Sequence, residues 1–174
     1  MIGKKLDLLL TYLVKKMSNK LYWLEDITNN SDIIEFFVKF SRFEYALKKN
    51  GYYIFNKKTN IIIKTNFDKF ASKYKKNKLS DKLQDFLIYL DNNPVGKLKS
   101  DGTYDKSKES ASSEIQRLMR YITIIRNNLF HGVKYSNLLG VDEHQRNKKL
   151  ITNGILAIDF FVELDDNVYS TYKE

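Results

Sequence analysis

The sequence predicts an all-α fold, an antiparallel helical bundle, from three observations. Apolar side chains recur at helical spacing through most of the 174-residue chain. The chain contains one proline, the residue that most often interrupts a helix. Its length suits one domain over residues 1–174, and neither an internal repeat nor a change in composition divides it.

The first predicted helix covers residues 6–17 and follows two lysines, so it superficially resembles a signal peptide. Asp7 interrupts its apolar run, and no small-residue cleavage site follows. We therefore expect an amphipathic helix of a soluble, cytoplasmic protein without a membrane-spanning segment. Its apolar face consists of Leu6, Leu9, Leu10, Leu13, Val14 and Met17.

A second helix is predicted from about Asp32 to Lys49, because Ser31 can cap its start and Gly51 can end it. Its apolar face is made of Ile33, Phe36, Phe37, Phe40, Phe43 and Leu47. After this helix, the spacing of apolar residues is no longer helical. Across residues 52–65 two apolar runs flank a polar stretch, which favours a short β-hairpin.

The middle of the chain predicts a helical stretch from about Asp68 and another helix over 80–90. Residues 91–113 contain the proline, two glycines and many serines, so they predict a long polar loop. Lysines between 57 and 82 alternate with aromatic residues. This pattern leaves two interpretations open, a solvated charged surface and a surface that follows RNA phosphates.

Two strong helices are predicted at the end, over about 113–130 and 142–164. The buried side of the last one consists of Leu150, Ile151, Ile155, Ile158, Phe161 and Val162. In the helix before it, the buried side consists of Ile115, Leu118, Met119, Ile122, Ile125 and Leu129. The opposite side carries polar groups around a single apolar residue, Ile124. Because an apolar residue in a polar face often marks a protein contact, we expect Ile124 in a dimer interface.

Composition excludes several kinds of site. The chain has no cysteine and two histidines, His131 and His144, so it predicts no disulfide, no thiolate metal site and no bound cofactor. Its net charge of +9 comes mainly from lysine, together with abundant asparagine, isoleucine and tyrosine. An AT-rich genome produces this mixture by default, so the positions of the few arginines are more informative than the total charge.

The segment Arg126-Asn127-Asn128-Leu129-Phe130-His131-Gly132 resembles the signature of the HEPN superfamily, an arginine followed after four to six residues by a histidine. Two further stretches are similar to bacterial HEPN proteins, Arg42 to Lys48 and Arg146 to Ile151. The resemblance covers most of the chain in order, except for about residues 52–111. We interpret Arg42 and Glu44 as structural contacts rather than catalytic groups.

The resemblance implies a helical bundle that dimerises with the two motifs facing one another in a cleft. Many such proteins are metal-independent endoribonucleases, often toxins or phage-defence effectors. His131 is then a general acid or base, Arg126 holds the phosphate, and Asn127 positions the phosphate or the imidazole. The expected RNA contacts are Arg117, Arg120, Asn128, Lys134 and Tyr135.

In HEPN toxins paired with a nucleotidyltransferase antitoxin, a tyrosine two residues after the histidine receives a nucleotide. Here that position is Val133, and the nearest tyrosine is Tyr135. Arg126 and His131 lie about 140° apart around a straight helix. They converge on one phosphate only if the helix unwinds, if the arginine curls round, or if a second subunit supplies one of them.

Two other functions remain open at this point. One is a catalytically silent HEPN module that binds RNA or a nucleotide. The other is a protein-interaction domain, such as an antitoxin partner, in which Ile124 and its neighbours contact protein. For the ribonuclease, the expected partners are the RNA substrate, a second copy of the chain and an antitoxin or regulatory protein.

Overall fold

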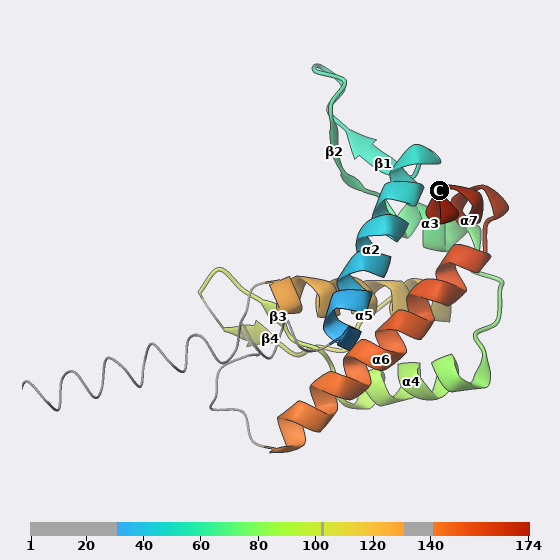
Figure 1. Cartoon of the computed structure of the whole chain (residues 1–174). Coiled ribbons are helices and arrows are strands. Elements are labelled where there is room, and N and C mark those ends of the chain that lie inside the picture. Colours follow the sequence, from blue (N-terminus) through green and yellow to red (C-terminus); the bar gives the residue numbers. More distant parts are fainter. Residues whose placement is uncertain (1–30, 102, 131–140) are drawn as a thin grey trace, which may run out of the picture.

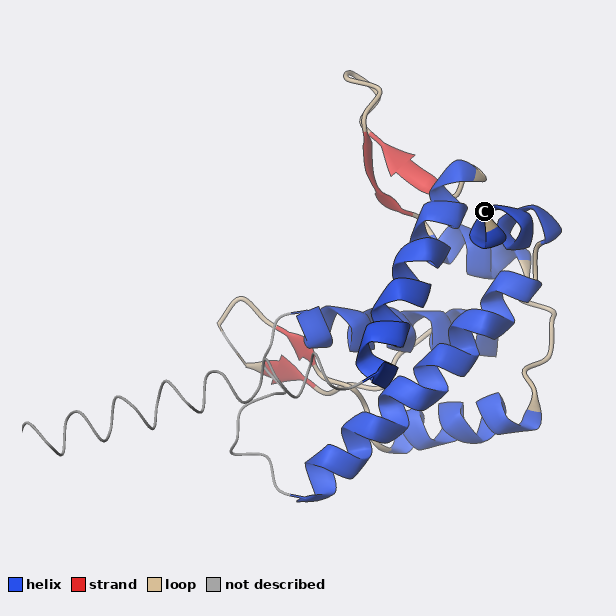
Figure 2. Ribbon diagram, viewed as in Figure 1, coloured by secondary structure: helices blue, strands red, loops and turns tan. Residues whose placement is uncertain are grey.

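The computed structural model describes residues 31–101, 103–130 and 141–174, and in these the chain is mostly helical, as expected (Figures 1 and 2). The helices are α2 (Ser31–Lys49), α3 (Phe67–Lys73), α4 (Asp81–Asn92), α5 (Glu114–Phe130), α6 (Val141–Glu163) and α7 (Asp166–Lys173). Two small antiparallel strand pairs accompany them: β1 (Tyr53–Phe55) with β2 (Ile62–Thr65), and β3 (Lys97–Leu98) with β4 (Tyr104–Asp105). The helix predicted over 6–17 lies outside the described residues.

Helices α2 and α6 form the main helix pair, and they run in the same direction (Figure 1). Phe36 of α2 lies against Gly154, where a Cβ atom would come within 2.7 Å of its ring. Further along both helices, Lys39 binds Asp159 at 2.7 Å. This pair is therefore parallel, whereas we expected neighbouring helices to be antiparallel. The long connection through α3, α4 and α5 allows the chain to return to the start of α2 before α6 begins.

The hydrophobic core lies between α2, α5 and α6, and it is rich in aromatic rings. Phe43 of α2 stacks on Phe161 of α6, with 6.2 Å between the ring centroids. All six residues predicted for the buried side of α5 are buried, as are five of the six predicted for α6, whereas Ile155 is partly buried. Helical periodicity thus identified the core faces correctly.

The hairpin predicted over residues 52–65 is confirmed. Tyr53 pairs with Thr65 and Ile54 with Lys64, before a bulge shifts the register at Phe55. At the turn, Asn60 has a φ of 55°, which asparagine tolerates better than most residues. The hairpin projects from the helical body in Figure 1.

The long loop predicted over 91–113 is more ordered than expected. It contains β3 and β4, and Val95 and Glu109 within it are buried. The chain passes so closely here that a Cβ atom at Gly96 would lie 2.9 Å from the Cβ of Tyr104. Polar composition indicated a loop, but the backbone pairs with itself against α5.

Helix α7 was not predicted. Its N-cap is Asp165, whose carboxylate accepts hydrogen bonds from the backbone N–H groups of Asn167 and Val168. Only Val168 of this helix is buried, so the segment lacks the apolar periodicity that would have revealed it.

Among the described residues, no helix combines the length and apolar character needed to cross a membrane.

Candidate functional site

The last turn of α5 holds Arg126 and Asn127 side by side. An Nη1 donor of Arg126 hydrogen-bonds to Oδ1 of Asn127 at 3.1 Å. The side chain of Arg126 keeps 30% of its surface exposed, and Asn127 is exposed. Two of the three residues named as catalytic from the motif are therefore in contact with one another and accessible to a ligand.

Arg126 also reaches across to α2. Its guanidinium carbon lies 5.5 Å from the centroid of the Phe40 ring, and Nη2 lies 3.8 Å from Oε2 of Glu44. A cation over an aromatic face is attracted to the ring, so Phe40 holds the planar group in position. The side chain of Arg126 is thus directed toward α2. Because His131 lies outside the described residues, the three geometries considered for the motif stay predictions.

A cleft of about 500 Å³ is lined by Glu44 and Asn127, two residues that Arg126 contacts. On one side it is bounded by α5, which contributes Arg120, Thr123, Ile124 and Asn127. Met119 of α5 also lines it. Its other lining residues come from α2, the β1–β2 hairpin, the start of α3 and the segment around β3 and β4: Glu44, Ile54, Lys64, Thr65, Asn66, Phe67, Asp68, Lys97 and Glu109. The face of α5 that was expected to be a free surface is therefore one wall of a cleft.

The acidic groups of the cleft are tied to neighbouring cations. Lys97 pairs with Glu109, whose carboxylate is almost completely buried. Glu44 binds Lys48 at 3.2 Å and accepts a hydrogen bond from the Thr65 hydroxyl at 2.9 Å. Acidic and basic groups therefore balance within the lining, and Arg126 adjoins the cleft through its contacts with Glu44 and Asn127.

Arg117 and Arg120, expected to contact RNA, are both engaged within the protein. An Nη2 atom of Arg117 lies 3.4 Å from Asp91. Arg120 pairs with Asp68 at 3.1 Å and donates to the Ser110 carbonyl. Arg120 still lines the cleft, whereas Arg117 does not.

Two of the proposed surface residues are buried, which corrects their expected placement. Ile124 is only 8% exposed, and Asn128 is 3% exposed, with its amide donating to the Gly96 carbonyl at 2.8 Å. Both lie beneath neighbouring segments that a helical wheel of α5 alone does not include. Ile124 is therefore part of the monomer's own packing, and Asn128 anchors the β3 segment.

His131, Lys134 and Tyr135 lie outside the described residues. Their assigned roles stay predictions from the motif. The described helix α5 ends at Phe130, directly before His131.

Phe40 and Glu44 are the site residues that sequence reasoning missed in this role. They lie four residues apart on α2 and so face the same direction. That spacing was visible in the sequence, but no nearby residue indicated that Arg126 of α5 would contact this face of α2. Arg42, by contrast, donates to the Tyr172 carbonyl at 2.7 and 3.0 Å, as a structural contact should.

A second polar cluster surrounds Asp165, away from the cleft. Its Oδ2 atom accepts hydrogen bonds from Tyr52 at 2.9 Å, Tyr74 at 2.6 Å and Lys73 at 3.0 Å. Burial opposes ionisation, yet these hydrogen bonds hold the pKa of Asp165 well below its usual range. Burial and the hydrogen bond to Asp165 raise the pKa of Tyr74 to about 12. Since the carboxylate also caps α7, the cluster joins α3 and the hairpin base to the C-terminal helix.

The aromatic residues between lysines 57 and 82 pack inward. Phe70 is fully buried, and Phe67 and Tyr74 are partly buried against the core. Nucleic-acid bases could not stack on the ring of Phe70. Within the described ranges, no group of three or more acidic or histidine side chains is arranged to hold a metal ion.

Comparisons with models of known protein families, with curated proteins and with solved structures give no match for this chain.

Proposed function

We propose that this protein is a HEPN-like, metal-independent endoribonuclease that acts as a homodimer, in a toxin or phage-defence setting. The observation that carries the proposal is the hydrogen-bonded pair of Arg126 and Asn127 at the end of α5, where Asn127 lines a cleft and His131 follows four residues later in the sequence. A guanidinium, an amide and an imidazole are together sufficient for RNA cleavage, because RNA supplies its own nucleophile.

In the proposed reaction, the 2′-oxygen attacks the adjacent phosphorus as the bond from phosphorus to the 5′-oxygen breaks. His131 transfers a proton at the 2′-hydroxyl or the leaving oxygen, since imidazole titrates near neutral pH. Arg126 binds the phosphate oxygens with its planar fork and stabilises their growing negative charge. The products are a 2′,3′-cyclic phosphate and a 5′-hydroxyl end.

The position of Arg126 suits this task. Its guanidinium lies over the Phe40 ring, which is itself buried in the core. The arginine is therefore already held in place before the phosphate binds, and binding costs little of its conformational entropy. Its contact with Glu44, at 3.8 Å, is longer than a hydrogen bond, so a phosphate can replace it.

The test is to incubate the wild-type protein with structured and unstructured RNA in EDTA and to determine the product ends. His131→Ala should abolish cleavage, while His144→Ala, the same change at the only other histidine, should leave it intact. Cleavage that absolutely requires Mg²⁺ would contradict the mechanism. Sedimentation of the active protein over a range of concentrations tests the homodimer.

A catalytically silent RNA- or nucleotide-binding module is the second candidate. It is favoured by the contacts of Arg126 with Phe40 and Glu44, because they give the guanidinium a structural role against α2 that does not depend on catalysis. RNA binding without cleavage, unchanged in His131→Ala, would identify this function.

A further inference from the structure

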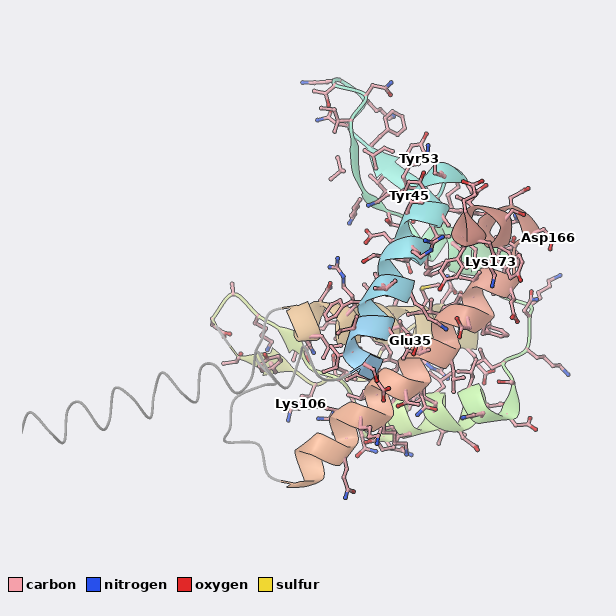
Figure 3. All side chains as sticks on the ribbon, viewed as in Figure 1. Glu35, Tyr45, Tyr53, Lys106, Asp166 and Lys173 are labelled. Atoms are coloured by element: carbon pink, nitrogen blue, oxygen red, sulfur yellow. The ribbon has the colours of Figure 1, made fainter. Side chains whose placement is uncertain are left out.

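Large, exposed apolar side chains lie on both sides of the polar turn of the β1–β2 hairpin. We define the hairpin surface as Phe55, Ile61, Ile62 and Ile63, which keep 43%, 64%, 43% and 63% of their surface accessible. With Ile54, they make up five of the ten large hydrophobic side chains that are exposed in the described residues. Figure 3 shows the hairpin rising beyond Tyr53 and away from Tyr45 on α2.

The base of the hairpin is fixed to the core, whereas the hairpin surface contributes nothing to it. Tyr52 is buried and donates to Asp165, and Thr65 is buried and donates to Glu44. Beyond these anchors, the strands carry large aliphatic groups in water. A concentration of such groups on an ordered, projecting element is typical of a contact surface for another molecule.

All the charged side chains of the hairpin are basic. From residue 52 to residue 67 it contains Lys57, Lys58 and Lys64 and no aspartate or glutamate. Among the described residues, none of these lysines forms an ion pair, in contrast to Lys39, Lys48 and Lys97, although Lys64 also lines the cleft. Their charges therefore remain available to a ligand that carries negative groups.

We propose that the hairpin surface docks a partner protein whose contact region combines aliphatic and acidic side chains. The aliphatic groups would fill the exposed apolar area, and the acidic groups would meet the three lysines. β1 and β2 pair only with each other in the described part of the chain, so each also has an outer edge to which a partner strand can add.

Other ligands fit the surface less well. Three of the four residues of the hairpin surface are isoleucines, which offer no aromatic face on which RNA bases stack, and the ring of Phe55 already packs against Tyr53. The tip of the hairpin, residues 56–60, is polar, whereas a membrane-inserting loop needs its apolar groups at the tip. A second copy of the chain would bring like-charged lysines together.

The test selects binders from a display library of random 16-residue peptides against the full chain. The selected peptides should be enriched in aliphatic and acidic residues. Ile61→Ser with Ile63→Ser should weaken their binding at least tenfold, while Ile34→Ser with Val38→Ser, at exposed sites on α2, should leave it unchanged. A library without enrichment, or peptides that bind the hairpin double variant as tightly as wild type, would overturn the proposal.

A charge-reversal pair tests the electrostatic part. Lys57→Glu with Lys58→Glu should weaken peptide binding tenfold, whereas Lys75→Glu with Lys76→Glu changes the net charge equally at exposed positions beyond α3 and should not. Equal weakening by both pairs would overturn the proposed site. Binding to vesicles of phosphatidylcholine and phosphatidylglycerol that the isoleucine variant loses, or loss of a dimer in that variant, would overturn it in favour of a membrane or a second copy. Peptide binding is read without RNA, so this proposal can fail or succeed independently of cleavage.

Discussion

The guanidinium of Arg126 lies over the ring of Phe40, 5.5 Å from its centroid, and this contact joins the last turn of α5 to α2. Phe40 is buried and packs against Phe36 and Phe67, so the arginine rests on a rigid part of the core. The residue that the motif singles out is therefore positioned by a helix more than eighty residues earlier in the chain.

Arg126→Lys should reduce RNA cleavage by about 100-fold, because a lysine cannot bind two phosphate oxygens with a planar fork. Single-turnover cleavage in EDTA measures the effect. Arg42→Lys is the matched control, since Arg42 binds only the Tyr172 carbonyl and its aromatic ring among the contacts described. Undiminished cleavage by Arg126→Lys would remove this residue from the mechanism.

Glu44→Gln should strengthen RNA binding by about fivefold, because it removes a negative charge 3.8 Å from the Arg126 guanidinium. Fluorescence anisotropy with a labelled, uncleavable RNA measures the affinity. The amide can still accept the Thr65 hydrogen bond, so the fold should be retained. Glu35→Gln, on the same helix but paired with Lys39, serves as the control. Weaker RNA binding by Glu44→Gln would show that the carboxylate supports the site.

Ile124→Asp should lower the free energy of unfolding by about 3 kcal/mol, because the side chain is buried within the monomer and a carboxylate there loses its hydration. Urea denaturation measures the change. Ile88→Asp, at a position that is 55% exposed on α4, should have little effect. If Ile124→Asp instead converts a dimer to a stable monomer, the dimer-interface role expected from the sequence would be restored.

The Asp165 cluster should make stability fall in acid. Because the pKa of Asp165 is lower in the folded protein than the value of about 3.9 for an unfolded aspartate, its contribution is fully present above about pH 4 and is lost as the pH falls further. Asp165→Asn should cost about 2 kcal/mol at pH 7 and flatten this acid dependence, since the amide lacks the charge that faces Lys73.

Chemical denaturation between pH 2 and pH 7 measures both effects. Asp166→Asn is the control, because Asp166 is the exposed neighbour in the first turn of α7. If the free energy of unfolding falls equally steeply in acid for wild type and Asp165→Asn, other carboxylates cause the loss of stability.

Local patterns identified most of the secondary structure. Apolar spacing predicted α2, α4, α5 and α6 within a few residues of their bounds, because a helix that packs on one side must repeat apolar groups at that period. Three elements escaped this signal. Helix α7 buries one apolar residue, and strands β3 and β4 are two residues long each, so none of them carries a readable period.

The sequence by itself determined the helical class, the core faces and the Arg-x4-His motif, since each depends on residue types at short spacing. Only the tertiary structure decided how α5 is surrounded. A helical wheel marks one side of a single helix as polar, but whether Ile124 and Asn128 there meet solvent depends on distant segments that pack over them. The contacts of Arg126 with Phe40 and Glu44 were likewise decided by packing, because they join helices that are far apart in the chain.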